Sequence, residues 1–155
     1  MRTTLLAILI FFSLPAYAQS EHGGAPGGEH EAHQNFVALF TGFTHEARRD
    51  NAFTIGAEYA RAFGERLTIG ALAEHAFGDH SFWILAVPFG YELGKWRAVV
   101  APGVELVESE SSNLVRLGIE YEFEVGGWGV APAFAVDFVE EDVVPIYGVV
   151  FSRGF

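Results

Sequence analysis

The sequence predicts an all-β protein: an eight-stranded antiparallel up-and-down transmembrane β-barrel, closed and with short loops. Three observations support this prediction. Residues 35–155 contain seven short polar breaks, which divide them into eight apolar segments. Within the segments, large apolar residues recur at every second position, the period of a β-strand and not of a helix. The positions between them carry glycine, alanine and charged residues, so each strand has one large apolar face and one small or polar face.

The composition excludes several other classes of protein. Half of the 155 residues are hydrophobic, 15% are aromatic and only 19% are charged, which excludes a disordered chain and a coiled coil. There is no cysteine, so neither a disulfide framework nor a thiolate metal site can form. The chain has nine basic and twenty acidic residues. This net charge of −11 has the wrong sign for a nucleic-acid-binding protein, and we expect no nucleic-acid partner.

Residues 1–18 have the pattern of a secretory signal peptide. A short positively charged start precedes an apolar run at residues 5–14, and an A-x-A cleavage pattern follows at residues 16–18. The apolar run is much shorter than the roughly 20 residues that a membrane-spanning helix needs. We therefore expect the chain to be exported and cleaved near Ala18.

Residues 19–34 are expected to form a flexible periplasmic tail. Glycine, proline, glutamate and histidine dominate this segment, and it shows no apolar periodicity. His22, His30 and His33 lie among glutamates, and imidazole nitrogens of this kind bind Zn²⁺, Ni²⁺ or Cu²⁺. The alternative is a soluble spacer, because a glycine-rich chain loses much entropy when it forms a site. No other cofactor is predicted.

The barrel itself is predicted from residue 35 to residue 155. Gly94-Lys95 and Gly126-Gly127 are two-residue hairpin turns, in which glycine supplies the positive φ. The pattern does not determine which face of the first strand points inward. The eight expected strands are residues 35–46, 52–63, 67–77, 81–93, 96–107, 113–125, 128–139 and 143–155.

The large apolar face is expected to point outward into lipid. In residues 83–93 every second residue is large and apolar. The lumen of an eight-stranded barrel is too small to hold the large side chains of all eight such faces. Eleven residues at about 3.3 Å each and a tilt of about 45° span roughly 25 Å, the height of an outer-membrane apolar band. Because no sheet edge can stay unpaired in lipid, the strands must close into a barrel.

Aromatic residues lie near both ends of the expected strands. Such residues mark the two lipid–water interfaces of a membrane barrel. An even number of strands puts both termini on one side, which in outer-membrane barrels is the periplasm. Phe63, Trp96 and Trp128 lie beside the tightest turns, and Phe53, Phe77, Trp83 and Phe138 lie beside the other breaks.

Over residues 35–155 the pattern resembles the small eight-stranded outer-membrane barrels of the OmpA/OmpX type. The resemblance implies an outer-membrane location in a Gram-negative bacterium, contact with outer-membrane lipid, and a monomer. The chain ends in Phe155, with Phe151 and Tyr147 on the same face, which resembles the signal read by the barrel-assembly machinery. Arg153 departs from that signal and is expected to extend its charge to the interface. The loops are short for this family, which disfavours adhesion.

Charged residues on the small face predict a network in the lumen. The two-residue turns fix the strand pairing and set Glu92 opposite Arg97 and Arg116 opposite Asp137. A loop centred near residues 110–111 adds Glu124 opposite Arg97 and Glu105 opposite Arg116. We interpret the network as structural filling of the lumen; a cation path or binding site is the alternative. The predicted network is Glu92, Arg97, Glu124, Glu105, Arg116 and Asp137.

Four residues near the outer rim could suggest catalysis: Glu74, His75, His80 and Ser81. Lipid-A-modifying barrels place a serine, histidine and acid set at this rim, where the serine must reach the histidine. Here His80 and Ser81 are adjacent and would face opposite sides of a strand, so we predict no catalytic residues. The expected function is a non-catalytic, structural or protective role in the envelope. Cation binding or passage through the tail and lumen, and lipid modification at the rim, are the alternatives.

Overall fold

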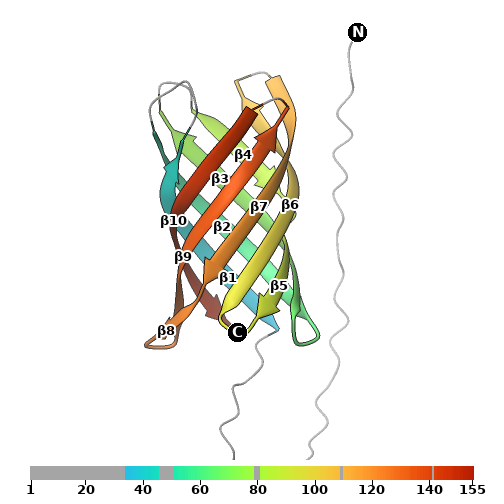
Figure 1. Ribbon diagram of the computed structural model, residues 1–155, viewed down its shortest axis with the longest axis vertical. Helices are drawn as coiled ribbons and strands as arrows, with labels where there is room; N and C mark the ends of the chain where they lie inside the picture. Colours follow the sequence, from blue (N-terminus) through green and yellow to red (C-terminus); the bar gives the residue numbers. More distant parts are fainter. Residues whose placement is uncertain (1–33, 46–50, 79–80, 109, 141) are drawn as a thin grey trace, which may run out of the picture. The chain divides into compact units, whose positions relative to one another are not determined.

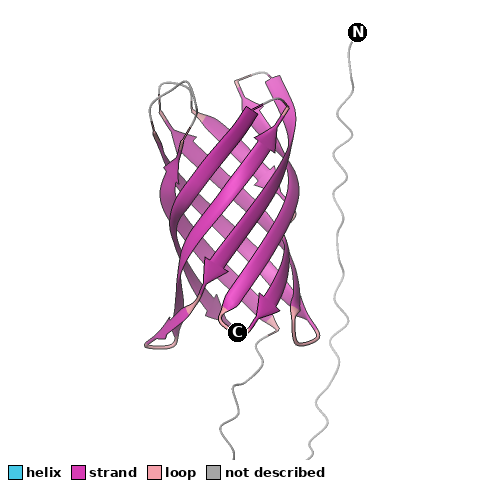
Figure 2. Cartoon of the chain, in the orientation of Figure 1, coloured by secondary structure: helices cyan, strands magenta, loops and turns pink. Residues whose placement is uncertain are grey.

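The computed structural model describes residues 34–45, 51–78, 81–108, 110–140 and 142–155, and these residues form an antiparallel β-barrel (Figures 1 and 2). The expected signal peptide, and the tail apart from Gln34, lie outside the described residues. No helix among the described segments is long and apolar enough to cross a membrane. The strands are β1 (Asn35–Thr44), β2 (Ala52–Phe63), β3 (Leu67–Phe77), β4 (Phe82–Ala86), β5 (Phe89–Leu93), β6 (Trp96–Val107), β7 (Glu110–Tyr121), β8 (Phe123–Val125), β9 (Trp128–Val139) and β10 (Asp142–Gly154).

The ten ladder segments make up eight strands. β4 and β5 are one strand interrupted at Val87 and Pro88, and both segments keep the same register with β3 and with β6. Val87 still donates its backbone N–H to Pro102 at 2.9 Å, but Pro88 and Pro102 have no N–H to donate. β7 and β8 are likewise one strand, broken opposite Pro132 on β9. The predicted eight strands are therefore confirmed.

The sheet closes because β1 pairs with β10 along its length, from Phe36 opposite Gly154 to Thr44 opposite Ile146. Following paired residues once around the barrel from Asn35 leads to His45, which lies ten positions further along the chain and directly after β1. This offset requires strands tilted by about 40°, and the tilt is visible in Figure 1. The path runs through Asn35, Arg61, Ile69, Phe89, Val100, Leu117, Val136, Pro145 and His45.

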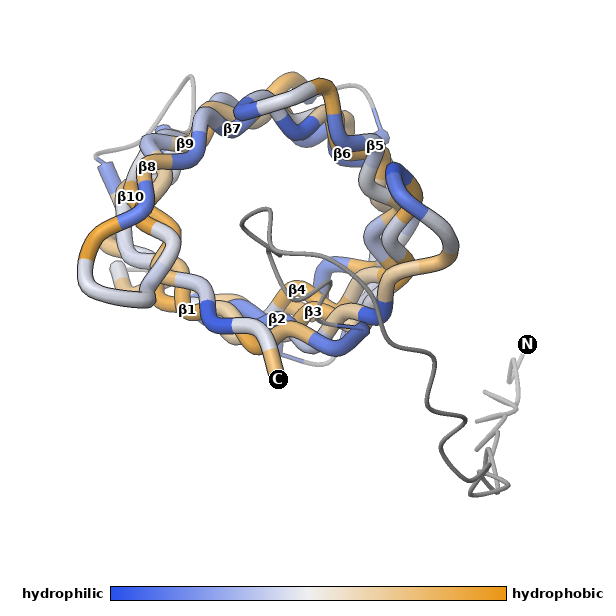
Figure 3. The backbone as a smooth tube through the Cα atoms, turned by 90° about the horizontal axis from the view of Figure 1, so that it is seen from below, coloured by the Kyte–Doolittle hydropathy of each residue, from blue (hydrophilic) through white to orange (hydrophobic). Residues whose placement is uncertain are grey.

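The two ends of the barrel differ in their connections. The terminus end carries Gln34, Phe155 and the turns at residues 64–66, 94–95 and 126–127. The loop end carries the opposite ends of the strands, at Thr44, Ala52, Phe77, Phe82, Val107, Glu110, Val139 and Asp142. Seen from the terminus end, hydrophobic and hydrophilic residues are interspersed around the ring of strands (Figure 3).

Large apolar side chains face outward all around the barrel. Thirty of them are exposed by 39% to 62%, among them Trp83 at 51%, whereas nine of the fourteen buried apolar residues are alanine or valine. This is the inverse of a soluble barrel and confirms the predicted facing. β1 follows the same rule, with Val37 and Leu39 outward and Phe40 in the lumen.

The loop between β6 and β7 is shorter than predicted. Val107 on β6 pairs with Glu110 on β7, so the strands are separated by two residues and not by the five residues expected at 108–112. Glu108 has a φ of 51°, in the left-handed region that favours glycine, so the usual glycine signal for a tight turn was missing. Residues 110–112 are polar and continue β7 beyond the apolar band, so their composition resembles that of a loop.

Aromatic side chains form a girdle at each end. At the loop end, Tyr147, Phe43, Phe53 and Phe77 follow one another with ring centroids 5.9 to 6.1 Å apart, and His75 lies between Phe77 and Trp83. At the terminus end, Trp96, Tyr121 and Phe123 are in edge contact. The guanidinium of Arg153 lies 5.3 Å from the ring centroid of Trp128.

Candidate functional site

The most deeply buried charges form a three-residue cluster in the lumen. Arg116 on β7 donates Nε to Oδ1 of Asp137 on β9 at 2.7 Å and Nη2 to Oδ2 at 2.9 Å. Its Nη2 also lies 2.6 Å from Oε2 of Glu74 on β3. Relative exposures are 6% for Arg116, 1% for Asp137 and 3% for Glu74. A bidentate pair with a second carboxylate is the strong geometry for a buried arginine.

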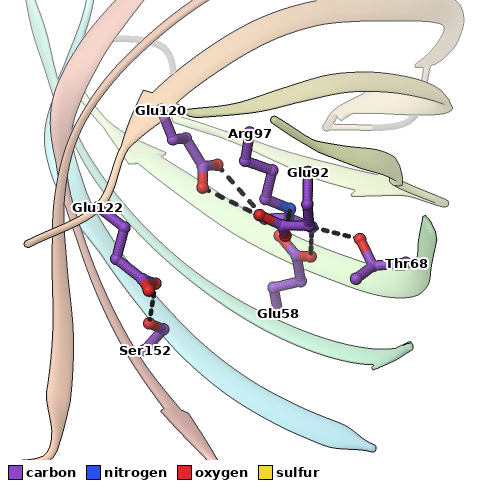
Figure 4. A network of polar contacts seen from close by, with 7 residues as sticks. All are labelled: Glu58, Thr68, Glu92, Arg97, Glu120, Glu122 and Ser152. Carbon is purple, nitrogen blue, oxygen red and sulfur yellow. Dashed lines mark hydrogen bonds and ion pairs between the residues drawn. The ribbon is translucent and has the colours of Figure 1, made fainter. Parts of the chain in front are cut away.

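A second cluster surrounds Arg97 nearer the terminus end (Figure 4). Its Nη2 lies 2.6 Å from Oε1 of Glu58 on β2, and its Nη1 lies 3.3 Å from Oε2 of Glu120 on β7. Glu92 on β5 is a looser partner, with Oε1 3.8 Å from Nε of Arg97. Thr68 accepts a further hydrogen bond of 3.4 Å. Three carboxylates around one arginine leave this cluster with excess negative charge.

Lumen glycines make room for these charged side chains. A Cβ at Gly90 would lie 2.6 Å from Nε of Arg97 and would also collide with Thr68. A Cβ at Gly56 would collide with the side chain of Glu74. The small residues of the inward face therefore fix where the ion pairs can lie.

A small cavity of about 50 Å³ lies between the two clusters. Glu58 and Glu120 line it from one cluster, and Glu74 and Arg116 line it from the other. A cavity of this size and polarity has room for water. Beyond Arg116, toward the loop end, the lumen is filled by apolar side chains, chiefly Phe82, Ile84, Leu114, Val139 and Val107.

The structure brings together part of the predicted charge network. Glu92 lies opposite Arg97 and Arg116 lies opposite Asp137, as the two-residue turns indicate. The pairings predicted across the β6–β7 loop were wrong. Because the loop is shorter than predicted, each residue of β6 lies opposite a β7 residue four positions earlier in the sequence than expected. The residue opposite Arg97 is Glu120 instead of Glu124.

The same shift moves the other predicted partners. Ala101 lies opposite Arg116, and Glu105 lies opposite Ser112. Glu124 lies on β8 opposite Gly129, exposed at the terminus end.

Sequence reasoning missed three carboxylates that contact the lumen arginines, Glu58, Glu74 and Glu120. Glu58 and Glu74 reach their arginines across the barrel and not from a neighbouring strand. Pairing rules between adjacent strands cannot find such contacts. The only signal was that these acids occupy the inward positions.

The rim residues do not come together as a catalytic set in the described part of the chain. Glu74 lies in the lumen with Arg116, whereas His75 lies on the outward face between Phe77 and Trp83. His80, like His22, His30 and His33, lies outside the described residues. Within the described ranges, no group of three or more histidine, aspartate or glutamate residues is arranged to hold a metal ion.

A closed eight-stranded barrel with an apolar exterior and a charged interior is the architecture of small outer-membrane barrels. The chain is similar in fold to the N-terminal β-barrel domain of Pseudomonas aeruginosa OprF, with a TM-score of 0.53, 12% identity, and coverage of 77% of this chain and 98% of that one. It is also similar to Ail, the attachment invasion locus protein of Yersinia pestis, with a TM-score of 0.51, 11% identity, and coverage of 78% and 96%. A designed transmembrane β-barrel matches with a TM-score of 0.55, 9% identity, and coverage of 76% and 94%.

No protein-family model matches the sequence, and no curated protein matches it. The similarity to solved structures therefore establishes the fold, as the sequence pattern predicts.

Proposed function

We propose that this protein is an integral outer-membrane β-barrel with a closed lumen and a non-catalytic, structural or protective role in a Gram-negative envelope. The main support is the distribution of polarity. The outer wall is covered with exposed large apolar side chains, while Arg116, Glu74 and Asp137 are buried inside. Such a surface is stable only in lipid.

The membrane location can be tested directly. The mature chain should fractionate with outer membranes, and it should migrate faster on detergent gels before boiling than after, because a closed barrel resists unfolding. Recovery from the soluble periplasmic fraction, without a heat-dependent shift, would exclude the proposal.

Cation passage is the second candidate, favoured by the excess of carboxylates around Arg97. Against it, the two arginine clusters and the apolar residues beyond Arg116 fill the lumen in series. An eight-stranded barrel is normally filled by its own side chains. We expect no steady conductance in planar bilayers, whereas stable cation-selective steps from the purified protein would favour passage.

The proposed role in the envelope has its own test. A strain lacking the gene should become more sensitive to detergents and large antibiotics, and the wild-type gene should restore resistance. We also propose insertion by the barrel-assembly machinery through the C-terminal strand, and a monomeric state. Lipid modification at the rim would instead appear as a change in lipid A mass when the protein is expressed.

Metal binding by the tail is a separate proposal. His22, His30 and His33 can supply imidazole ligands for Zn²⁺, Ni²⁺ or Cu²⁺. Removing residues 19–33 should abolish any binding measured by titration calorimetry and leave the heat-dependent gel shift intact. Gln34 is kept because its carbonyl accepts a 2.8 Å hydrogen bond from the backbone N–H of Ala62. Unchanged affinity after the deletion would move the metal site into the barrel.

A further inference from the structure

Among the described residues, the basic side chains outside the lumen have an uneven distribution. The described chain contains six arginine and lysine residues, of which Arg97 and Arg116 lie in the lumen. The other four all lie at the terminus end: Arg61, Arg66, Lys95 and Arg153. Two of these, Arg61 and Arg153, are on the outward faces of strands and not in turns.

Arg61 and Arg153 flank β1. Arg61 on β2 pairs with Asn35, and Arg153 on β10 pairs with Val37. They are thus two strands apart, about 10 Å across the sheet. Between them the phenol of Tyr59 donates a 2.9 Å hydrogen bond to Oδ1 of Asn35. The described residues on the outward faces of β10, β1 and β2 include no acidic side chain.

The aromatic girdle holds one of these arginines at the membrane interface. Arg153 lies over the ring of Trp128 at 5.3 Å, a cation–π contact that positions the guanidinium at the level of the girdle. Tyr59 occupies the same level on the other side of β1, opposite Val37. At this depth a bilayer presents the phosphates of its headgroups.

An apolar depression in the outer wall begins at the same place. It is lined near the arginines by Trp128, Phe151, Val37, Tyr59 and Leu39, and it extends over outward-facing alanines. Ala57 on β2 lies opposite Ala73 on β3, so small side chains replace the large ones found elsewhere on the wall. Such a depression fits an extended hydrocarbon chain.

We propose that this surface binds an anionic phospholipid, with its phosphate at Arg61 and Arg153 and an acyl chain in the depression over Ala57. The proposal rests on the membrane location proposed above. The positive charge and the apolar depression together select a lipid of this chemistry. A second copy of the chain is disfavoured because it would bring like charges together.

The test uses the full mature chain, reconstituted in vesicles of phosphatidylcholine with an equal amount of phosphatidylglycerol. After extraction into mild detergent, native mass spectrometry counts the lipids that stay bound. We expect one phosphatidylglycerol to be retained in preference to phosphatidylcholine. Each arginine lost near a membrane surface should weaken retention about fivefold, so Arg61→Gln with Arg153→Gln should weaken it about 25-fold.

Arg66→Gln with Lys95→Gln is the matched control, because it removes the same charge from the same end outside the surface. It should retain phosphatidylglycerol as the parent does. Ala57→Phe keeps both arginines but fills the depression, and it should also lose the lipid. The heat-dependent gel shift shows for every variant whether the barrel has formed, so a failure of insertion is distinguished from a failure of lipid binding.

Three results would overturn the proposal. The first is equal retention of the two lipids by the parent, and the second is equal loss from the control and from the Arg61 and Arg153 variant. The third is selective binding that appears only after residues 19–33 are removed. In that case the acidic tail, which precedes Asn35 and therefore joins the barrel opposite Arg61, occupies the surface.

Discussion

Replacing Arg116 by methionine should lower the free energy of unfolding by about 3–5 kcal/mol, the usual cost of removing one side of a buried ion pair. The substitution leaves Glu74 and Asp137 facing each other with 3% and 1% exposure. Two carboxylates in so little solvent repel each other and have lost their shared donor. Urea or heat unfolding in detergent, followed by tryptophan fluorescence, measures the change.

Two controls separate the loss of pairing from a loss of packing. The triple variant Arg116→Met, Glu74→Gln, Asp137→Asn should be less destabilised than Arg116→Met alone, because no buried charge remains unpaired. Arg97→Met should also cost less, because Arg97 and its close partners Glu58 and Glu120 have side chains exposed by 14%, 12% and 17%, so water can reach the carboxylates that remain. If Arg116→Met is as stable as the parent, these charges are solvated and their pairing does not stabilise the barrel.

The fold could be predicted because strand period and membrane thickness constrain the same residues. In residues 83–93 the alternation gave both the strand and the face that meets lipid. The alternation continues past Pro88, where the backbone hydrogen bonding between the strands is interrupted, because the loss of a hydrogen bond there leaves the register unchanged. The pattern does not determine which face of the first strand points inward, because Phe36 and Phe40 are as large as the residues that face outward.

The charge network was predictable only as far as the turns were recognised. The glycines in Gly94-Lys95 and Gly126-Gly127 indicate tight turns. The pairs Glu92 with Arg97 and Asp137 with Arg116 could therefore be predicted. The turn at Glu108 has no glycine, so the β6–β7 register was predicted wrongly by four residues. As a result, Glu105 and Glu124 were predicted to lie opposite arginines that they do not face. Contacts across the lumen, such as Glu74 with Arg116, depend on the shear of the closed barrel, which requires all eight registers at once.

The seam where the barrel closes should be its least tolerant place for an added methyl group. Gly42 on β1 lies opposite Gly148 on β10. A Cβ at Gly42 would lie 2.8 Å from Cα of Gly148 and 2.6 Å from Cζ of Phe40, and it would collide with the backbone carbonyl of Tyr147. Because two of these three neighbours are backbone, the strands must separate to make room.

We therefore expect Gly42→Ala to destabilise the barrel by about 3 kcal/mol, at the upper end of the usual cost of overpacking, and to reduce the fraction that shows the heat-dependent gel shift. Gly118→Ala is the matched control in the same lumen, since its Cβ would meet the nearest atom, Cβ of Ala135, at an ordinary 3.4 Å. In a Phe40→Ala background, Gly42→Ala should cost less than in the parent but still destabilise the barrel, because the contacts with Tyr147 and Gly148 remain. Equal stability of Gly42→Ala and Gly118→Ala would mean that the β1–β10 seam is loose enough to absorb a side chain, contrary to the close approach of its two glycines.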